Sequence, residues 1–426
     1  MRLRQAGGHM LLTGSASGVQ TVCAFVALAF NARALGPEDF GVLAMIQGYA
    51  AMVSSLATFE SWQPMIRLGV ISRRRLGHTL GCGAFLDLAA ASAATAVAIL
   101  GILLFGPILG IAEGYQHLAI IYSLSLLGGV GGTPKGYFRL AGRFSVLAGN
   151  QISQGLALLT SAAILWALDA SLLVYVVVLA AIAAIYNLTL FLRMLADLRR
   201  AEINLANPLR SPTARNYLRQ VFSMATGTSL LSTLLNARRN IPLFLVGALV
   251  GSNAAGAFAV GAKLANFATR LSGPINQVLF PLVIRANRPA DGGRPFHWIG
   301  AASIAAGFAA VCLASVAFFF RNWVVSVAAG PGFSSAGLVF SLLFAAECIG
   351  LAGLHINASI QSIRGTRPLI IIGLLSLLPL VPVAVVLSPN LGAIGIAVAC
   401  LLSAALTYVG MMVTVLWLLR NKSHDA

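Results

Sequence analysis

Charged residues are scarce in this sequence. Asp, Glu, Lys and Arg together make up only 9% of the 426 residues, and just 11 residues are acidic. Soluble domains carry about 25% charged residues, because a surface that faces water needs them. A chain that is 58% hydrophobic cannot cover itself with so few charges. We therefore expect its surroundings to be lipid.

The motifs of soluble enzymes are also missing. The chain has no glycine-rich phosphate-binding loop of the Walker type, which excludes an ATP-driven step within it, and no HExxH or paired Cys/His spacing for a metal. Its five cysteines fall inside apolar runs without CxxC spacing, which is typical of small buried residues. We predict a protein that is not an enzyme and that needs no cofactor and no metal.

Long apolar runs, in contrast, repeat from one end of the chain to the other. Between glycine, proline and charge breaks there are about twelve segments long enough to cross a bilayer as helices. They are 10–35, 41–64, 77–105, 117–137, 145–168, 171–193, 217–250, 254–284, 298–320, 334–360, 367–388 and 391–419. The sequence thus predicts an all-α polytopic membrane protein.

Basic residues divide the loops into two sets. Most of the 28 Lys and Arg residues fall in every second loop or terminus, whereas the opposite loops "LDAS" and "GSNAAG" contain none. Loops rich in Lys and Arg stay in the cytoplasm, so both termini are predicted to be cytoplasmic. The outer loops are short, which disfavours a membrane glycan polymerase, since such an enzyme usually needs a sizeable outer loop for its acids and bases.

The two halves of the chain resemble each other. The stretch "NARALGPEDFGVLAM" (31–45) has its counterpart in "VGALVGSNAAGAFAV" (246–260), and the glycine pair Gly36 and Gly41 matches Gly251 and Gly256 at the same offset. We expect these glycines to let two outer hairpins turn tightly. The halves are predicted to be pseudo-symmetric six-helix lobes, 1–195 and 217–426, joined by a basic cytoplasmic linker, 196–216. Such internal repeats are typical of transporters whose site lies between the repeats.

Polar residues form stripes on the first two helices of each half. At about 100° per residue, the polar residues of 254–284 fall on one face of that helix, and those of 217–250 also share a face. We predict a substrate cavity lined by Arg239, Lys263, Arg270, Asn236, Asn240, Asn266, Gln277, Gln20, Asn31 and Gln47. The neutral stripes have a second interpretation, since such residues also hold helices together in bilayers.

The cations of these stripes favour an anionic ligand. A charged side chain at mid-bilayer costs about 2.5–3.5 kcal/mol on insertion scales, and Arg binds phosphate oxygens bidentately. The acids within the spans are Glu60, Asp87 and Glu347, too few to pair with every base. For these three acids two interpretations stay open: ion-pair partners, or sites where a proton or Na⁺ couples to transport.

Four motifs resemble one known family. "ARALGPEDFGVLAM" resembles the first hairpin of the polysaccharide-transporter (O-antigen flippase) family of the multidrug/oligosaccharidyl-lipid/polysaccharide superfamily, and "YFRLAGRFSVLAGNQIS" its fourth-to-fifth connection. "GSNAAGAFAVGAKLANFATRLSGPINQVLFPLVIR" is similar to its eighth helix, and "IRGTRPLIIIGLLSLLPLVPVAVVLSPNLGAIGIAVACLLS" to its last two helices. The motifs occur in the family's order and span nearly the whole chain.

The resemblance implies a V-shaped pair of lobes in a bacterial inner membrane, with a central cavity that opens alternately to either side. It implies undecaprenyl-pyrophosphate-linked oligosaccharide as substrate, for exopolysaccharide, capsule or O-antigen assembly, and a polymerase and a chain-length regulator as partners. The chain departs from many relatives in the segment "NARRN" (236–240), which lacks an acid. The ion that drives transport therefore stays open.

Other functions fit less well. A multidrug efflux antiporter of the same superfamily usually needs an acidic cavity for cationic drugs, and the predicted lining here is basic. A murein-precursor flippase has a similar cationic cavity but typically two further C-terminal helices. Nucleic acid is not an expected partner, because the basic loops lack interleaved aromatic residues and are typical of contacts with anionic lipid head groups.

Overall fold

A computed structural model of the chain describes residues 2–57, 73–205, 218–219, 222, 239–267, 297–364 and 367–422. Over these ranges the regular secondary structure is helical, without a β-strand. The chain divides into two compact units, Met1–Leu35 with Val42–Asn240, and Gly36–Gly41 with Ile241–Ala426. The predicted linker 196–216 lies partly outside the described residues, so its bounds stay a prediction.

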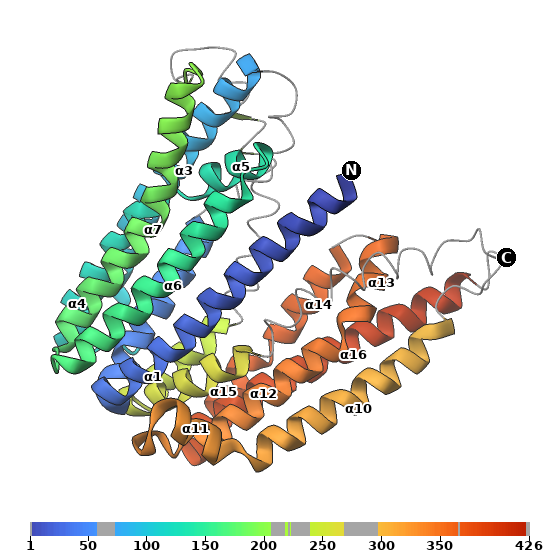
Figure 1. The fold of residues 1–426 in the computed structure, drawn as a ribbon. Coiled ribbons are helices and arrows are strands. Elements are labelled where there is room, and N and C mark those ends of the chain that lie inside the picture. Colours follow the sequence, from blue (N-terminus) through green and yellow to red (C-terminus); the bar gives the residue numbers. More distant parts are fainter. Residues whose placement is uncertain are drawn as a thin grey trace. The chain divides into compact units, whose positions relative to one another are not determined.

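The first unit is a bundle of long helices. Its elements are α1 (Arg2–Ala57), α3 (Arg73–Phe105), η1 (Glu113–Tyr115), α4 (Gln116–Ser123), η2 (Leu124–Gly128), α5 (Gly132–Leu140), α6 (Phe144–Ala167) and α7 (Leu172–Arg200). Figure 1 shows α3, α4, α6 and α7 running alongside one another; α4 packs on α3 and α7, and α6 packs on α7. The turn from α5 to α6 is tight, because Gly142 takes a left-handed φ of 67° and ends α5.

The second unit repeats this scheme. Residues 239–249, of which 241–249 belong to this unit, and residues 252–267 are helical. They are followed by α10 (His297–Phe319), α11 (Arg321–Ala329), η4 (Pro331–Phe333), α12 (Ala336–Ala352), α13 (Leu354–Arg364), α14 (Arg367–Leu377), α15 (Leu380–Leu391) and α16 (Ala393–Lys422). Helix α12 packs against both α10 and α16, and α14 and α15 also pack on α16.

The helices are those of a multi-pass membrane protein. Among the described residues six are long and apolar enough to cross a bilayer, and a seventh if the bent pair of α12 and α13 counts as one span. One of the six, Leu12–Ser55, covers the first two predicted spans, since it contains the break at Gly36. The all-α fold is confirmed, and the layout is consistent with twelve spans in two lobes.

Three predicted spans are not continuous helices. The one at 367–388 is divided into α14 and α15 by a turn at Leu378 and Pro379, and the other two break at glycine. The span predicted at 117–137 consists of α4, η2 and α5, with residues 129–131 outside any helix. The span predicted at 334–360 bends by 42° between α12 and α13, at Gly353. Glycine lies at both breaks, because it gives up helical geometry at little cost.

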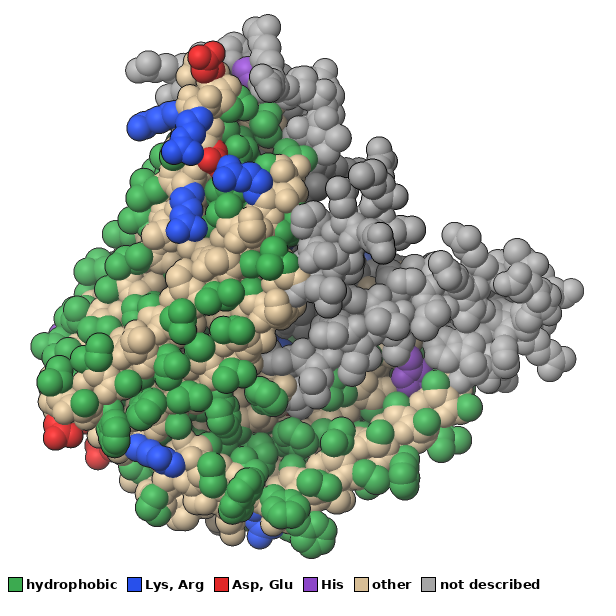
Figure 2. Space-filling model, viewed as in Figure 1, with side chains coloured by type: hydrophobic (Ala, Val, Ile, Leu, Met, Phe, Trp, Pro, Cys, Tyr) green, Lys and Arg blue, Asp and Glu red, His purple; other side chains and the backbone are tan. Residues whose placement is uncertain are grey.

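The surface is apolar where a soluble protein would be polar. Large hydrophobic side chains point outward along α10, where Ile304 is 76% exposed, Phe308 73% and Phe319 81%. Figure 2 shows such side chains spread over the visible helices, while Lys and Arg gather toward one end of the first unit. Exposed Arg193, Arg199 and Arg200 lie at the corresponding end of α7. Apolar flanks with a basic end match a bilayer and its head groups.

The two hairpins turn at their first glycines, as expected. Gly36 has a φ of 68° and interrupts α1. Gly251 has a φ of 112° and lies between the helices of residues 239–249 and 252–267. Pro37 follows Gly36 and starts the next helix, where its fixed φ suits the first turn. A side chain at either glycine would be strained, because L residues rarely adopt these angles.

The second glycines serve a different purpose from the one expected. Gly41 and Gly256 do not turn the chain; both lie within helices of the second unit and touch each other there. A Cβ on Gly41 would lie 2.7 Å from the Gly256 nitrogen, and a Cβ on Gly256 would overlap the Pro37 carbonyl oxygen. These two glycines allow close backbone packing between the two hairpins.

We predict that Gly256→Ala lowers the thermal unfolding midpoint of the purified protein. The added methyl group must displace the backbone of Pro37, and overpacking of this kind costs about 1–3 kcal/mol. Gly307→Ala is the matched control, since nothing lies within 4 Å of a Cβ there and alanine favours a helix by up to about 1 kcal/mol. Equal unfolding midpoints for the two variants would contradict the close packing.

Candidate substrate site in the membrane

Three cations were predicted to line the site, and Lys263 is the one whose surroundings the structure describes in most detail. It lies on the helix of residues 252–267, is exposed, and places its Nζ 5.1 Å from the ring centroid of Phe40. Phe40 is 1% exposed and meets the ring of Phe333 edge to face at 5.8 Å. Because the Phe40 ring is fixed by this packing, it can hold the ammonium group in one place by a cation–π contact.

The ring under Lys263 comes from the other half of the sequence. Residues 36–41, the tip of the first hairpin, belong to the second unit. Pro37 packs close to the same pair of rings. A Cβ placed on Gly332, the residue before Phe333, would lie 3.8 Å from the Pro37 ring. The tip of the first-half hairpin therefore helps to position a cation of the second half.

The other predicted lining residues of the second half are only partly described. Asn266 is half-buried in the same helix as Lys263. Arg239 is exposed and Asn240 half-buried, and both fall in the first unit, whereas Lys263 and Asn266 fall in the second. Asn236, Arg270, Gln277 and the acid Glu60 lie outside the described residues.

The neutral residues of the first half differ from one another. The Gln20 amide donates a hydrogen bond of 2.6 Å to Gln154 Oε1, so it joins α1 to α6. The backbones come close here because position 155 is glycine, where a Cβ would lie 2.9 Å from the Gln20 Cα. Asn31 is 9% exposed, and its Oδ1 is buried without a hydrogen-bond partner in the part of the chain that the structure describes. Gln47 is half-buried.

The two described acids lie in different surroundings. Asp87 on α3 is 4% exposed, and its Oδ2 accepts the backbone N–H of Thr133 at 2.7 Å. Lys135, two residues further along α5, is half-buried near Asp87, with its Nζ 5.6 Å from the ring centroid of Tyr186. Glu347 is half-buried on α12. Asp87 thus holds the N-terminus of α5 and has a cation nearby, while its assignment as an ion-pair partner stays a prediction.

Sequence reasoning missed the polar residues around the two broken helices. Lys135 lies within α5, and neither it nor Thr133, His355 or Ser303 is among the predicted site residues. The signal was present in the glycines of "GGVGG" (128–132) and in Gly353. Interrupted hydrophobic segments at corresponding positions of two halves often mark functional parts of transporters.

Comparison with known proteins places the chain in a family. The pattern of the family described as "Polysaccharide biosynthesis protein" matches residues 9–286. Inner membrane protein YghQ of Escherichia coli (strain K12) is 23% identical over 281 residues, which is 64% of this chain and 78% of that protein.

Solved structures share the fold. An inward-facing multidrug resistance MATE family transporter of the MOP superfamily is 16% identical, with a TM-score of 0.67 and 93% of each chain covered. The lipid II flippase MurJ, in an inward closed conformation, is 11% identical, with a TM-score of 0.70, 95% of this chain covered and 87% of that one. With its family pattern matched over most of its length, the chain belongs to the polysaccharide biosynthesis protein family, and it shares its fold with these transporters.

Proposed function

We propose that the protein flips undecaprenyl-pyrophosphate-linked oligosaccharide units from the cytoplasmic to the outer face of the bacterial inner membrane. The product would serve exopolysaccharide, capsule or O-antigen assembly. Membership of a polysaccharide biosynthesis family supports a glycan substrate. The likeness to a lipid II flippase supports movement of a lipid-linked sugar across the bilayer.

One observation carries the proposal, namely an exposed lysine inside an apolar helix. Lys263 follows the buried run Ala255, Ala257, Phe258, Ala259 and Val260. A cation at membrane depth costs about 2.5–3.5 kcal/mol unless something compensates it. The quadrupole of the Phe40 ring supplies part of that compensation. A pyrophosphate group would add charge-assisted hydrogen bonds to the ammonium group.

The remaining predicted lining residues fit the two parts of this substrate. Arg239 and Arg270 would bind phosphate oxygens alongside Lys263, since guanidinium groups present paired donors. Asn236, Asn240, Asn266, Gln277, Gln20, Asn31 and Gln47 would take the sugar hydroxyls. Asn31, with its buried unpartnered Oδ1, is the first-half residue best prepared to accept a donor from the substrate.

Transport would proceed by alternating access. The lipid tail stays in the bilayer while the head group enters the cavity between the lobes, and rocking of the lobes carries it across. Both termini and the basic loops would lie in the cytoplasm. A glycan polymerase and a chain-length regulator are the partners that we expect on the product side.

Multidrug efflux is the second candidate, favoured by the likeness to a MATE family transporter. Such an antiporter would export cationic drugs, and these bind best to buried carboxylates. Asp87 is held by the N-terminus of α5 and lies near Lys135, so it is poorly placed to serve a drug. The basic lining therefore favours the glycan substrate.

Deletion of the gene should abolish surface polysaccharide and cause undecaprenyl-pyrophosphate-linked oligosaccharide to accumulate. Wild-type protein should clear the intermediate, whereas Arg239→Ala, Lys263→Ala and Arg270→Ala should each fail although they insert stably, because the pyrophosphate loses a cation. The intermediate is measured by mass spectrometry of extracted lipids. Arg193→Ala, an exposed position at the basic end of α7, is the control and should restore transport.

The same strains separate the two functions. Intact polysaccharide together with new drug sensitivity in the deletion strain would replace the flippase by the efflux antiporter. Full complementation by all three alanine variants would overturn the cationic site.

Binding in vitro should depend on Lys263 and on the ring beneath it. With protein in lipid nanodiscs and undecaprenyl pyrophosphate as the probe, we expect Lys263→Met to weaken binding about tenfold or more, since charge-assisted hydrogen bonds contribute about 1.5–3 kcal/mol. Phe40→Leu should weaken it by a smaller factor, because the charge remains and only its cation–π support is lost. Lys263→Arg should bind nearly as wild type. Unchanged affinity of Lys263→Met would contradict the assignment.

A further inference from the structure

The fourth helix of each half is broken at a comparable point. In the first half, α4 and η2 end at Gly128 and α5 begins at Gly132. In the second half, α12 ends at Ala352 and α13 begins at Leu354. A helix that restarts within a membrane leaves N–H groups without intrahelical partners at its new start, and these groups need partners from elsewhere.

In the first half the partner is a carboxylate from the third helix. Thr133, the second residue of α5, is fully buried and donates its backbone N–H to Asp87 Oδ2 on α3 at 2.7 Å. An anion at a helix N-terminus is also favoured by the helix dipole. Lys135 on the same turn lies close enough to Asp87 for its charge to act on it. The contact therefore ties the start of α5 to α3.

In the second half the break is bridged by an imidazole, which contacts a hydroxyl and a backbone carbonyl instead of an N–H of α13. His355, the second residue of α13, is 4% exposed, and its Nε2 lies 2.8 Å from Ser303 Oγ on α10. The ring also hydrogen-bonds to the carbonyl of Ala352, the last residue of α12. The side chain thus spans the break and joins it to the third helix of the half.

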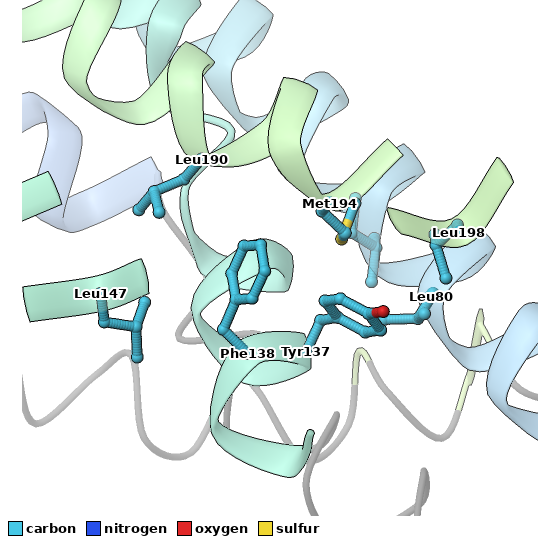
Figure 3. Close-up of a cluster of buried hydrophobic side chains, with 8 residues drawn as sticks. Leu80, Tyr137, Phe138, Leu147, Leu190, Met194 and Leu198 are labelled. Atoms are coloured by element: carbon cyan, nitrogen blue, oxygen red, sulfur yellow. The ribbon is translucent and has the colours of Figure 1, made fainter. Parts of the chain in front are cut away.

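Beyond each break an apolar cluster holds the second segment. Tyr137 and Phe138 of α5 pack with Leu190, Met194 and other residues of the cluster in Figure 3, which come from α3, α6 and α7. In the second unit, Ile356 and Ile360 of α13 pack with Ile299, Met411 and Val415 of α10 and α16. Each second segment therefore has an apolar anchor of its own beyond the break.

We propose that α5 and α13 are hinged segments, positioned by Asp87 and His355 respectively, and that transport requires these two contacts to hold them against the third helix of each half. Asp87 is then a positioning residue that acts through α5, not a carboxylate that couples an ion. His355 has the same role in the second half with different chemistry. Only the transport consequence rests on the proposed function.

Hydrogen–deuterium exchange of the full-length protein in nanodiscs tests the contacts directly. Asp87→Ala should make the amides at the start of α5 exchange about tenfold faster, the order expected when one charge-assisted hydrogen bond is lost. Asp87→Asn keeps an acceptor and should restore exchange to near the wild-type rate. His355→Leu and the milder Ser303→Ala should speed exchange at the start of α13, whereas His355→Gln, which keeps an acceptor for Ser303, should not.

Transport assays of the same variants test the role. Asp87→Ala should slow clearance of the lipid-linked intermediate while undecaprenyl pyrophosphate still binds, and Asp87→Asn should clear it at close to the wild-type rate. Fast clearance by Asp87→Ala, or failure of Asp87→Asn to restore both exchange and clearance, would overturn the proposal. If the proposed function is wrong, undecaprenyl pyrophosphate does not bind to the wild-type protein, but the exchange rates of the variants still follow the expected pattern. If the proposal for α5 and α13 is wrong, the exchange rates themselves depart from it.

Discussion

The fold depends on one constraint of the bilayer, that every backbone N–H and C=O in lipid must find a partner within the protein. Continuous helices meet it automatically, so each interruption needs its own compensation. At Gly251 the N–H donates to the carbonyl of Val246, which closes the helix before the turn. At the start of α5 the compensation comes from Asp87, and at the end of α12 from His355. At both of these broken helices a buried polar side chain supplies the compensation.

The sequence was sufficient for the spans because hydropathy is a local property. Apolar runs and glycine breaks located α6, α10 and α16 to within a few residues, and helical phase predicted polar residues on common faces. The sequence was insufficient to predict which side chains contact one another, because the two members of such a pair lie far apart along the chain. Thr133 is 46 residues from Asp87, and the ring under Lys263 belongs to the opposite half of the sequence. Only packing decides such pairs.

Duplication preserved geometry more than chemistry. Gly36 and Gly251 both turn a hairpin with positive φ, since only the backbone matters there. The contacts at the two broken helices occupy corresponding places but pair a carboxylate with an amide in one half and an imidazole with a hydroxyl in the other. A side-chain contact needs only complementary donors and acceptors, so different residues can tie a broken helix to its neighbour.

This view separates two kinds of charge in the membrane. Asp87 is compensated by its own unit, through an N–H of α5 and the nearby Lys135, and so has a structural explanation. Lys263 rests on an aromatic ring, which attracts a cation without neutralising it. A cation in a low-dielectric setting attracts an anion strongly. An anion that a lipid carries into the bilayer is therefore the kind of ligand that we propose for Lys263.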